Sequence, residues 1–579
     1  MRKIVQRKSQ PKVAQQLEAS GISALMARLL SVRGVTEVMQ VSANLSHLLP
    51  PDTLTHNSSM ARLLADAIEA NKQLLVIGDY DADGATATAV AIKGLRAFGA
   101  KVDFLVPNRF EYGYGLTPEI VALAARKKPA LIITVDNGIA SVEGVAAANA
   151  LGIQVLITDH HLPGQVLPQA ACIINPNQHG CTFESKNLAG VGVMFYALLA
   201  LRAEFRARGA YQVNAEGREG ALGRARTAEP NLSELLDLVA LGTVADLVKL
   251  DDNNRILVEQ GLRRIRAGAC SSGILALLRV SGRQSQTTHA QDLAFSVGPR
   301  LNAAGRLDDM TLGIQCLLAE TEIEATKIAQ QLQDLNLQRR SLEADMQEAA
   351  SLSLDDIDVE NQCSISMYQA DWHQGVIGIL ASRIKERYHR PVIVFANAGD
   401  GLLKGSGRSI AGLHLRDALD LLSKHHPDLI LKFGGHAMAA GLTIKQLDFE
   451  LFNQSFEMIV KSLITVADLE SVLEVDGSLN ASDMTFVTAQ MLERQVWGQG
   501  FAPPLFYDEF EVINQRVLGE KHLKLTLKTI DQALVIDAIY FNHPALLTSP
   551  VRAAYQLQTN SYNGAQKVQL NLQYIESTL

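Results

Sequence analysis

Five apolar runs of three to five residues follow one another between residues 73 and 174, and alanine-rich stretches typical of helices separate most of them. Runs that are apolar throughout are typical of strands buried on both faces of a parallel sheet. This alternation of strands and helices predicts a parallel α/β sheet. We expect strands at residues 73–77, 102–106, 131–135, 154–158 and 172–174, and helices at residues 85–98, 116–126 and 142–150.

The pattern differs on either side of this region. Residues 1–70 are amphipathic and predicted to be helical, and residues 187–249 are mostly helical around a polar loop. Residues 322–352 form one long polar stretch that is typical of a helix connecting domains. A second α/β pattern runs from about residue 363 to 460.

Short alternating strands follow from about residue 473, and they predict a small β-barrel. A single hydrophobic core rarely serves more than ~250–300 residues, so a chain of 579 residues is expected to be a multidomain α/β protein. We divide it into an N-terminal helical segment, a parallel-sheet domain, a helical connector, a second α/β domain and a barrel, at residues 1–70, 71–250, 251–355, 356–465 and 466–579.

Composition excludes a generally basic surface. The net charge is −8, so any nucleic-acid site must be a local basic groove on an acidic protein. The five cysteines are odd in number and form no C-x-x-C motif, which favours reduced thiols in the cytoplasm. No signal peptide or membrane span is expected, because the longest apolar stretch, residues 191–201, is too short to cross a bilayer. We expect a monomer.

Acidic residues and histidines follow three of the expected strands. Ligands of open α/β sheets bind beyond the carboxyl ends of the strands, so these side chains are expected to meet. Helix capping and turns also use aspartate, and that interpretation competes with a binding site. The residues concerned are Asp79, Asp81 and Asp83, then Asp136, then His160 and His161.

Carboxylates and imidazoles without thiolates suit Mn²⁺, and also Mg²⁺ or Zn²⁺. Several carboxylates packed together at neutral pH indicate more than one divalent ion. Asp246 interrupts an apolar helical segment, and local sequence leaves open whether it is another ligand or a surface turn residue.

The segments DYDADG, Asp136-Asn137-Gly138, Asp159-His160-His161 and GTVADL together resemble the DHH phosphoesterase superfamily, and within it the branch of single-strand-specific 5′→3′ DNA exonucleases. The resemblance runs from about residue 70 to the end of the chain. It implies a site for two ions, Mn²⁺ or Mg²⁺, in which Asp81 and Asp83 each bind one ion and Asp136 bridges them.

By the same resemblance, His160 and Asp246 are further ligands, and His161 contacts the phosphate or a metal. Asp79 supports the site or binds a metal. Some members of the superfamily have a histidine at the position of Ile77. The metal shell of this chain must therefore differ from theirs at that point.

Further segments resemble the substrate-binding parts of the same branch. For each of them, an ordinary turn, a solvated loop or a packing role is the competing interpretation. Residues 295–307 are interpreted as a small-residue loop that tracks DNA phosphates. The implied substrate-binding residues are Arg109, Tyr114, Arg300, Asn302, Arg306, Ser406, Arg408, Gly434, Gly435 and His436.

The resemblance also implies that the second α/β domain is the DHH-associated domain and that the barrel is an OB fold. OB folds bind single strands by a basic groove and aromatic stacking. A solvated strand face is the alternative interpretation for the barrel residues. The candidates here are Lys521, Lys524, Lys528, Tyr540 and Phe541.

The expected activity is metal-dependent digestion of single-stranded DNA from the 5′ end to 5′-mononucleotides, in DNA repair and recombination. A single-strand-binding protein and a helicase are the partners that the resemblance implies. Two alternatives are a DHH-family phosphodiesterase or oligoribonuclease that acts on small nucleotides, and a non-catalytic DNA-binding replication scaffold. The length of the chain disfavours the first, and its intact set of acids disfavours the second.

Overall fold

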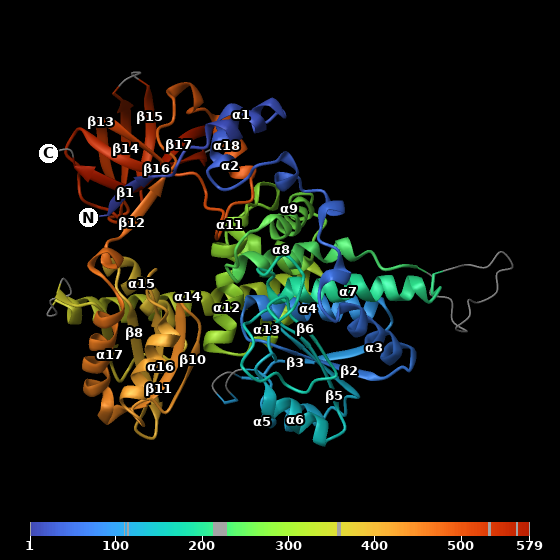
Figure 1. Ribbon diagram of the computed structural model, residues 1–579. Helices are drawn as coiled ribbons and strands as arrows, with labels where there is room; N and C mark the ends of the chain where they lie inside the picture. Colours follow the sequence, from blue (N-terminus) through green and yellow to red (C-terminus); the bar gives the residue numbers. More distant parts are fainter. Residues whose placement is uncertain are drawn as a thin grey trace. The chain divides into compact units, whose positions relative to one another are not determined.

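The computed structural model describes residues 2–108, 111–112, 115–211, 228–355, 361–530, 534–562 and 565–577. The chain forms two compact units (Figure 1). The smaller unit consists of Met1–Val5 and Asp334–Glu474, and the larger unit consists of Gln6–Gln333 and Val475–Leu579.

A five-stranded sheet lies at the centre of the larger unit, with strand order β3-β2-β4-β5-β6 and every pair parallel. The parallel α/β sheet is therefore confirmed, and its strands begin and end within one residue of the prediction. They are β2 (Gln73–Gly78), β3 (Lys101–Leu105), β4 (Leu131–Val135), β5 (Gln154–Thr158) and β6 (Cys172–Ile174).

Helices cover both faces of this sheet. In Figure 1, α5 and α6 lie on one face, and α3, α4 and α7 lie on the other. Leu75 and Ile77 of β2 pack into the apolar cluster under α5 and α6, while the alternate residues Leu74 and Val76 are buried on the opposite face. The helices are α3 (Asn57–Glu69), α4 (Ala82–Ala97), α5 (Pro118–Ala125), α6 (Val142–Ala150) and α7 (Gly190–Ala207).

Helix α4 starts earlier than the sequence pattern predicts. It begins at Ala82, with Asp81 as its N-cap, so Asp83 lies in its first turn instead of preceding it. The apolar stretch at residues 191–201 forms most of the buried helix α7, as expected.

A helical module follows the sheet. Residues 295–307 are helical, which corrects the loop interpretation: a π-helical turn, Leu293–Val297, leads directly into α12. A proline at the start of α12 favours helix initiation, and its small residues allow close packing. The module consists of α8 (Leu236–Ala245), α9 (Asp252–Arg266), α10 (Ser272–Val280), α11 (Ala290–Asp292), α12 (Gly298–Leu307), α13 (Thr311–Leu318) and the predicted long helix α14 (Glu322–Asp355).

The N-terminal segment is less helical than predicted. Besides α1 (Pro11–Ala19), α2 (Ala24–Ser31) and α3, it contains a short strand, β1 (Lys3–Gln6), and three 3₁₀ turns. Strand β1 pairs with β12 (Val472–Val475) in a two-stranded sheet. The charged and polar composition of residues 1–10 hides this strand from a search for apolar periodicity.

The C-terminal part of the larger unit is a closed five-stranded barrel, as predicted, in the order β13-β14-β15-β17-β16. Its core contains Phe506, Phe510 and Tyr555, all fully buried. Helix α18 (Phe486–Arg494) precedes it. The strands are β13 (Phe506–Leu518), β14 (His522–Thr529), β15 (Val535–Tyr540), β16 (Val551–Tyr562) and β17 (Ala565–Ser577).

The smaller unit contains a mixed sheet in the order β10-β11-β9-β8-β7, in which only β7 and β8 are parallel. Phe395, Phe452 and Phe456 lie in its apolar core. The strands are β7 (Ile365–Tyr368), β8 (Val392–Gly399), β9 (Leu402–Arg408), β10 (Lys432–Gly435) and β11 (Ala439–Lys445), and the helices are α15 (Ile377–Tyr388), α16 (Leu415–His425) and α17 (Phe449–Leu463).

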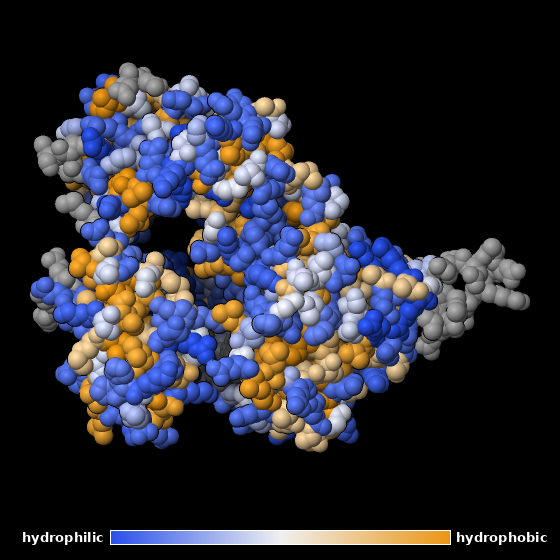
Figure 2. Space-filling view, viewed as in Figure 1, coloured by the Kyte–Doolittle hydropathy of each residue, from blue (hydrophilic) through white to orange (hydrophobic). Residues whose placement is uncertain are grey.

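Hydrophilic residues cover most of the visible surface, and apolar residues form scattered patches between them (Figure 2). Within the described ranges, no helix is both long and apolar enough to cross a membrane.

A buried ion pair connects the N-terminal helices to the barrel end of the chain. The two Nη atoms of Arg33 lie 2.9 and 2.8 Å from the two carboxylate oxygens of Asp476. Arg7 also reaches this carboxylate, and Leu505 donates its backbone N–H to it at 2.9 Å. Both side chains of the Arg33–Asp476 pair are almost fully buried.

We predict that Asp476→Ala lowers the free energy of unfolding of the larger unit by ~3–5 kcal/mol, because the substitution leaves buried guanidinium groups without their counter-charge. Denaturant unfolding followed by circular dichroism measures the change. Glu470→Gln is the control, because Glu470 and Lys3 form an exposed pair at 3.8 Å. Removal of such a surface pair changes stability by less than ~1 kcal/mol. Equal effects of the two substitutions would contradict the prediction.

Candidate metal centre

Three adjacent strands of the parallel sheet, β2, β4 and β5, end at the same edge, and each is followed by residues of the predicted site. Asp79 and Asp81 follow β2, Asp136 follows β4, and His160 follows β5. Because the strands are parallel and in register, their carboxyl ends bring these side chains together.

Asp83 is fixed by the start of helix α7. Its two carboxylate oxygens accept the backbone N–H groups of Gly190 and Val191 at 2.6 and 2.9 Å. The positive end of the helix dipole therefore stabilises a carboxylate that is almost entirely buried. Gly190 is required here, because a Cβ atom at this position would lie 2.5 Å from the Cβ atom of Asp136.

Asp136 has a left-handed backbone conformation, with φ at 61°. The side-chain amide of the next residue, Asn137, donates to the carbonyl oxygens of Ile77 and Val135 at 3.1 and 2.9 Å. These bonds tie the ends of β2 and β4 together around the turn. The Asp136 side chain is thus held at the sheet edge by a rigid backbone.

His160 lies among three of the acids. Its Nε2 atom is 3.1 Å from Asp136 Oδ1, 3.6 Å from Asp246 Oδ2 and 4.0 Å from Asp83 Oδ2. Asp246 is the C-terminal capping residue of α8, and this position brings it into the cluster. Asp246 therefore lies beside the other predicted ligands and not at an isolated surface turn, and its role as a metal ligand stays a prediction.

Sequence reasoning assigned no role to Asp159, although it directly precedes the two histidines. Its Oδ1 atom accepts from the Nδ1 atom of His161 at 2.7 Å and from the backbone N–H groups of both histidines. Its Oδ2 atom accepts the backbone N–H of Ile139 at 2.9 Å. Asp159 therefore orients the His161 ring, in the way that outer-shell carboxylates orient metal-site histidines.

The two partners of this contact have shifted pKa values. Burial opposes the charge on His161, but the hydrogen bond and charge of Asp159 outweigh it and raise the pKa of His161 to about 9. Burial also works to raise the pKa of Asp159, and the hydrogen bond and charge of His161 bring it below its usual value.

The remaining acids repel one another. Burial and the charge of Asp81 raise the pKa of Asp83 to about 7, against the hydrogen bonds from the start of α7. Burial and the neighbouring carboxylates raise the pKa values of Asp136 and Asp246 well above the usual value. A divalent cation would relieve this repulsion.

The donor atoms fit such a cation. Three overlapping groups of residues each offer ligand atoms that lie within 4.8 Å of one another. Together the groups supply carboxylates and imidazoles without a thiolate, which suits Mn²⁺ or Mg²⁺. The groups are Asp136, His160 and His161; Asp83, His160 and Asp246; and Asp79, Asp81 and Asp136. All six predicted metal-binding residues thus lie in one cluster.

Helix α12 packs directly against the acidic segment after β2. A Cβ atom on Gly305 would lie 1.8 Å from the carbonyl oxygen of Tyr80. Asn302 accepts the backbone N–H of Ala82 at 2.8 Å, at the start of α4. The small residues of α12 therefore serve this helix contact, and Arg300 donates to the Ser296 carbonyl of the preceding turn. Arg306 lies near the C-terminal end of α12.

The predicted substrate residues of the smaller unit lie on adjacent strands. Strand register places Ser406 opposite Gly441, which in turn lies opposite Gly434. Gly435 ends β10, and the next residue, His436, donates its backbone N–H to the Ala439 carbonyl.

Arg408 ends strand β9, close to Ser406. Its Nη1 atom is 3.3 Å from Ser406 Oγ, and its Nη2 atom lies beside Gly378 at the start of α15. Burial lowers the pKa of Arg408. Within the described part of the chain, Arg408 has no carboxylate partner. Arg109 and Tyr114 lie outside the described residues.

Two of the barrel lysines proposed to bind single strands, Lys524 and Lys528, are already paired with carboxylates. Lys528 forms an ion pair with Glu511 at 3.1 Å, and Lys524 forms one with Asp537 at 3.4 Å. Their partners lie on the neighbouring strands β13 and β15. This face of β14 is therefore partly neutralised.

Three family models match the chain. Residues 73–243 match the DHH family, N-terminal domain, residues 361–462 match the DHHA1 domain, and residues 475–574 match the RecJ OB domain. The metal cluster lies mainly in the first of these regions, with Asp246 just beyond it.

Curated relatives match along the whole chain. The single-stranded-DNA-specific exonuclease RecJ of Dickeya dadantii is 48% identical, over 99% of this chain and 100% of the relative. The protein of the same name from Escherichia coli is 47% identical, over 94% of each chain.

The crystal structure of RecJ in complex with Mn²⁺ from Thermus thermophilus has the same fold. The TM-score is 0.80 at 28% identity, and the match covers 100% of this chain and 79% of the other. Since the domain models, the full-length relatives and this structure all agree, the chain belongs to the RecJ family.

Proposed function

We propose that this chain is a metal-dependent exonuclease that degrades single-stranded DNA from the 5′ end to 5′-mononucleotides, in DNA repair and recombination. The cluster of carboxylates and imidazoles at one edge of the parallel sheet carries the proposal. The curated relatives are single-stranded-DNA-specific exonucleases, which supports the substrate and the reaction. The 5′→3′ direction follows the exonuclease branch that the sequence motifs resemble.

The cluster is proposed to hold two divalent ions, Mn²⁺ or Mg²⁺, since the Thermus thermophilus relative is known in complex with each. Bound ions of this kind lower the pKa of a water molecule and neutralise charge on a phosphate. The proposed ligands are Asp79, Asp81, Asp83, Asp136, His160 and Asp246.

The chain's own groups prepare the site for a phosphate. Asp159 holds the Nδ1 proton of His161, so the Nε2 atom of the ring remains for the phosphate or a metal. The start of α7 keeps Asp83 in place, so this carboxylate does not have to move when ions bind. Such preorganisation is the main contribution that a protein makes to phosphoryl-group chemistry.

The substrate contacts that we propose come from arginine and backbone groups. Arg408 and Ser406 can offer hydrogen bonds to a phosphate, supported by the start of α15 beside them. Gly434, Gly435 and His436 are proposed to contact the same strand. Arg300 and Arg306 of α12, and Arg109 and Tyr114, complete the proposed substrate set.

We further propose that the chain acts in the cytoplasm as a monomer, with a single-strand-binding protein and a helicase as partners. All five cysteines are free thiols in the structure, which supports a reducing compartment.

The direct test compares single-stranded DNA labelled at the 5′ end, the same DNA labelled at the 3′ end, and blunt duplex DNA, each with Mn²⁺, Mg²⁺ or EDTA. Labelled mononucleotide should appear at once from the 5′-labelled strand, while the 3′-labelled strand shortens gradually. Duplex and EDTA reactions should be slow. Early release of the 3′ label, equal digestion of duplex, or activity in EDTA would each disprove the proposal.

A second prediction concerns Asp136. Asp136→Ala should reduce the cleavage rate by more than ~100-fold, a loss at least as large as that caused by removing an outer-shell partner of a metal. Affinity for single-stranded DNA should change little, because the barrel and the smaller unit remain intact. Asp103→Asn is the control, since Asp103 is half exposed and pairs with Lys127 away from the strand ends. Normal cleavage by Asp136→Ala would refute the metal assignment.

The raised carboxylate pKa values predict how the metal-free chain responds to pH. Folding raises the pKa of Asp83 from 3.8 to about 7, so between these values the folded chain binds more protons than the unfolded chain. Stability in EDTA should therefore fall as the pH rises through this window. Asp136→Asn removes one repelling charge and should flatten the decline.

Thermal unfolding of both proteins in EDTA, from pH 5 to pH 8, measures this difference. Added Mn²⁺ should raise the melting temperature of the wild-type chain more at pH 8 than at pH 5, because protons compete for the same oxygens. A decline of the same steepness in Asp136→Asn would show that repulsion in the cluster is not its cause.

A further inference from the structure

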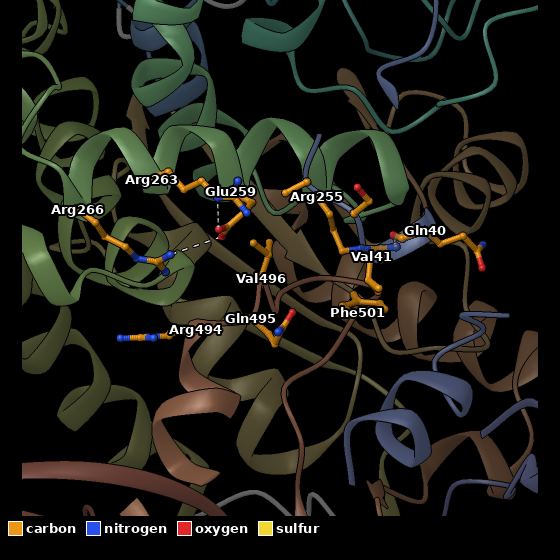
Figure 3. Close-up of a pocket in the computed structure, with 12 residues that line it drawn as sticks. Gln40, Val41, Arg255, Glu259, Arg263, Arg266, Arg494, Gln495, Val496 and Phe501 are labelled. Atoms are coloured by element: carbon orange, nitrogen blue, oxygen red, sulfur yellow. Dashed lines mark hydrogen bonds and ion pairs between the residues drawn. The ribbon is translucent and has the colours of Figure 1, made fainter. Parts of the chain in front are cut away.

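A polar cavity lies in the larger unit, where three segments far apart in the sequence meet (Figure 3). The segments are residues 40–43, helix α9, and residues 494–501, which begin at the last residue of α18. The cavity measures about 240 Å³, which is below the ~300–1,000 Å³ of pockets for drug-sized ligands. We call it the arginine pocket, after Arg255, Arg263, Arg266 and Arg494.

The charge of the arginine pocket is opposite to that of the chain. Four arginines and one glutamate, Glu259, line it, which gives a formal charge of +3 on a chain whose net charge is −8. Figure 3 shows Arg263, Arg266 and Glu259 on one side of α9, with the Arg494 side chain extending toward the same end of the pocket.

The guanidinium group of Arg255 already bonds to other groups of the chain. It donates to the carbonyl oxygens of Leu250 and Gln40, pairs with Asp252 at 2.6 Å, and lies 4.2 Å from the centre of the Phe501 ring. This arginine forms one wall of the pocket and holds residue 40 in place.

Glu259 cannot balance the other three arginines. Its carboxylate is 2.8 Å from Arg263 Nε and 3.5 Å from Arg266 Nη1. The Nη2 atom of Arg266 is buried without a hydrogen-bond partner. Among the residues that the structure describes, the guanidinium group of Arg494 has neither a hydrogen bond nor an ion pair. Burial lowers the pKa of Arg266, and the charges of Arg494 and Arg263 lower it further while Glu259 opposes them.

We propose that Arg263, Arg266 and Arg494 form a phosphate-binding site outside the metal centre. A phosphate group offers three acceptor oxygens and carries the charge that Glu259 lacks, and guanidinium groups bind it with paired hydrogen bonds. A single carboxylate would only repeat the role that Glu259 already has.

The surroundings of the arginine pocket point to a phosphate of single-stranded DNA or to a free nucleotide. Helix α9 follows α8, which ends beside Asp246 of the metal centre. On the other side, Glu493 accepts the backbone N–H and hydroxyl of Thr559 on barrel strand β16, each at 2.8 Å. The pocket therefore lies between the helices of the metal centre and the barrel. The DNA source rests on the proposed function, whereas the anion site itself does not.

The test uses the full chain in EDTA, so that no phosphate can bind through a metal. Arg266→Gln/Arg494→Gln is compared with the wild type and with Arg126→Gln, an exposed arginine at the C-terminal end of α5. Fluorescence anisotropy measures the affinity for a labelled oligothymidylate over a range of salt concentrations. Melting temperatures with and without pyrophosphate or a deoxynucleotide test the free ligands.

If the pocket holds a DNA phosphate, the double variant binds oligothymidylate about tenfold more weakly, and the slope of log affinity against log salt falls by ~0.7 for each lost contact. If it holds a free phosphate ligand, the variant keeps its DNA affinity but loses the stabilisation by pyrophosphate or nucleotide. Either result supports the site, provided that Arg126→Gln behaves as wild type.

The proposal is wrong if the double variant folds normally and neither binding changes. It is also wrong if the variant loses only the binding of an aspartate-rich peptide, because the pocket then takes carboxylates. Arginines in the last turn of a helix also stabilise its dipole, and that role alone would lower the melting temperature without changing either affinity. If the wild type fails to digest DNA but the variant still loses anion binding, only the proposed function fails.

Discussion

Repulsion among buried carboxylates is the constraint on which the parallel-sheet domain depends. Asp79, Asp81, Asp83, Asp136 and Asp246 lie within one cluster, and the burial of Asp79, Asp83 and Asp136 removes water that would otherwise screen them. Two contacts oppose this repulsion: the start of α7 donates two N–H groups to Asp83, and Asp159 supports a cationic His161. The raised pKa values of Asp83, Asp136 and Asp246 reflect the burial and repulsion that these contacts do not offset. Bound divalent ions would neutralise the repulsion that remains among these carboxylates.

Holding the acids so close requires backbone segments to approach one another without side chains between them. The start of α7 reaches Asp83 and Asp136 because residue 190 is glycine. Helix α12 reaches the carbonyl of Tyr80 because residue 305 is glycine. Gly190 is 107 positions from Asp83 and Gly305 is 225 positions from Tyr80, so residues far away in the sequence set the geometry of the site. A side chain at either glycine would separate the walls of the cluster.

The sequence was most informative where one rule decided the structure. Apolar runs located the five strands of the parallel sheet, and the topology of parallel strands then brought the predicted ligands to one edge. It was least informative where a role depends on a partner elsewhere in the chain. The glycine, proline and alanine of residues 295–307 resemble a loop until the close contact with Tyr80 is known.

Dependence on a partner elsewhere in the chain also explains why the sequence did not reveal the pairing of the barrel lysines or the role of Asp159. Lys528 is paired because strand register places Glu511 opposite it, and register cannot be read from one strand. The support that Asp159 gives to His161 depends on which ring nitrogen faces it. An acidic chain with such neutralised lysines has little general attraction for DNA. We therefore propose that its phosphate contacts come from few, local arginines such as Arg408, Arg266 and Arg494. Long-range repulsion then disfavours unspecific binding, and only a strand that reaches those arginines gains enough short-range attraction to overcome it.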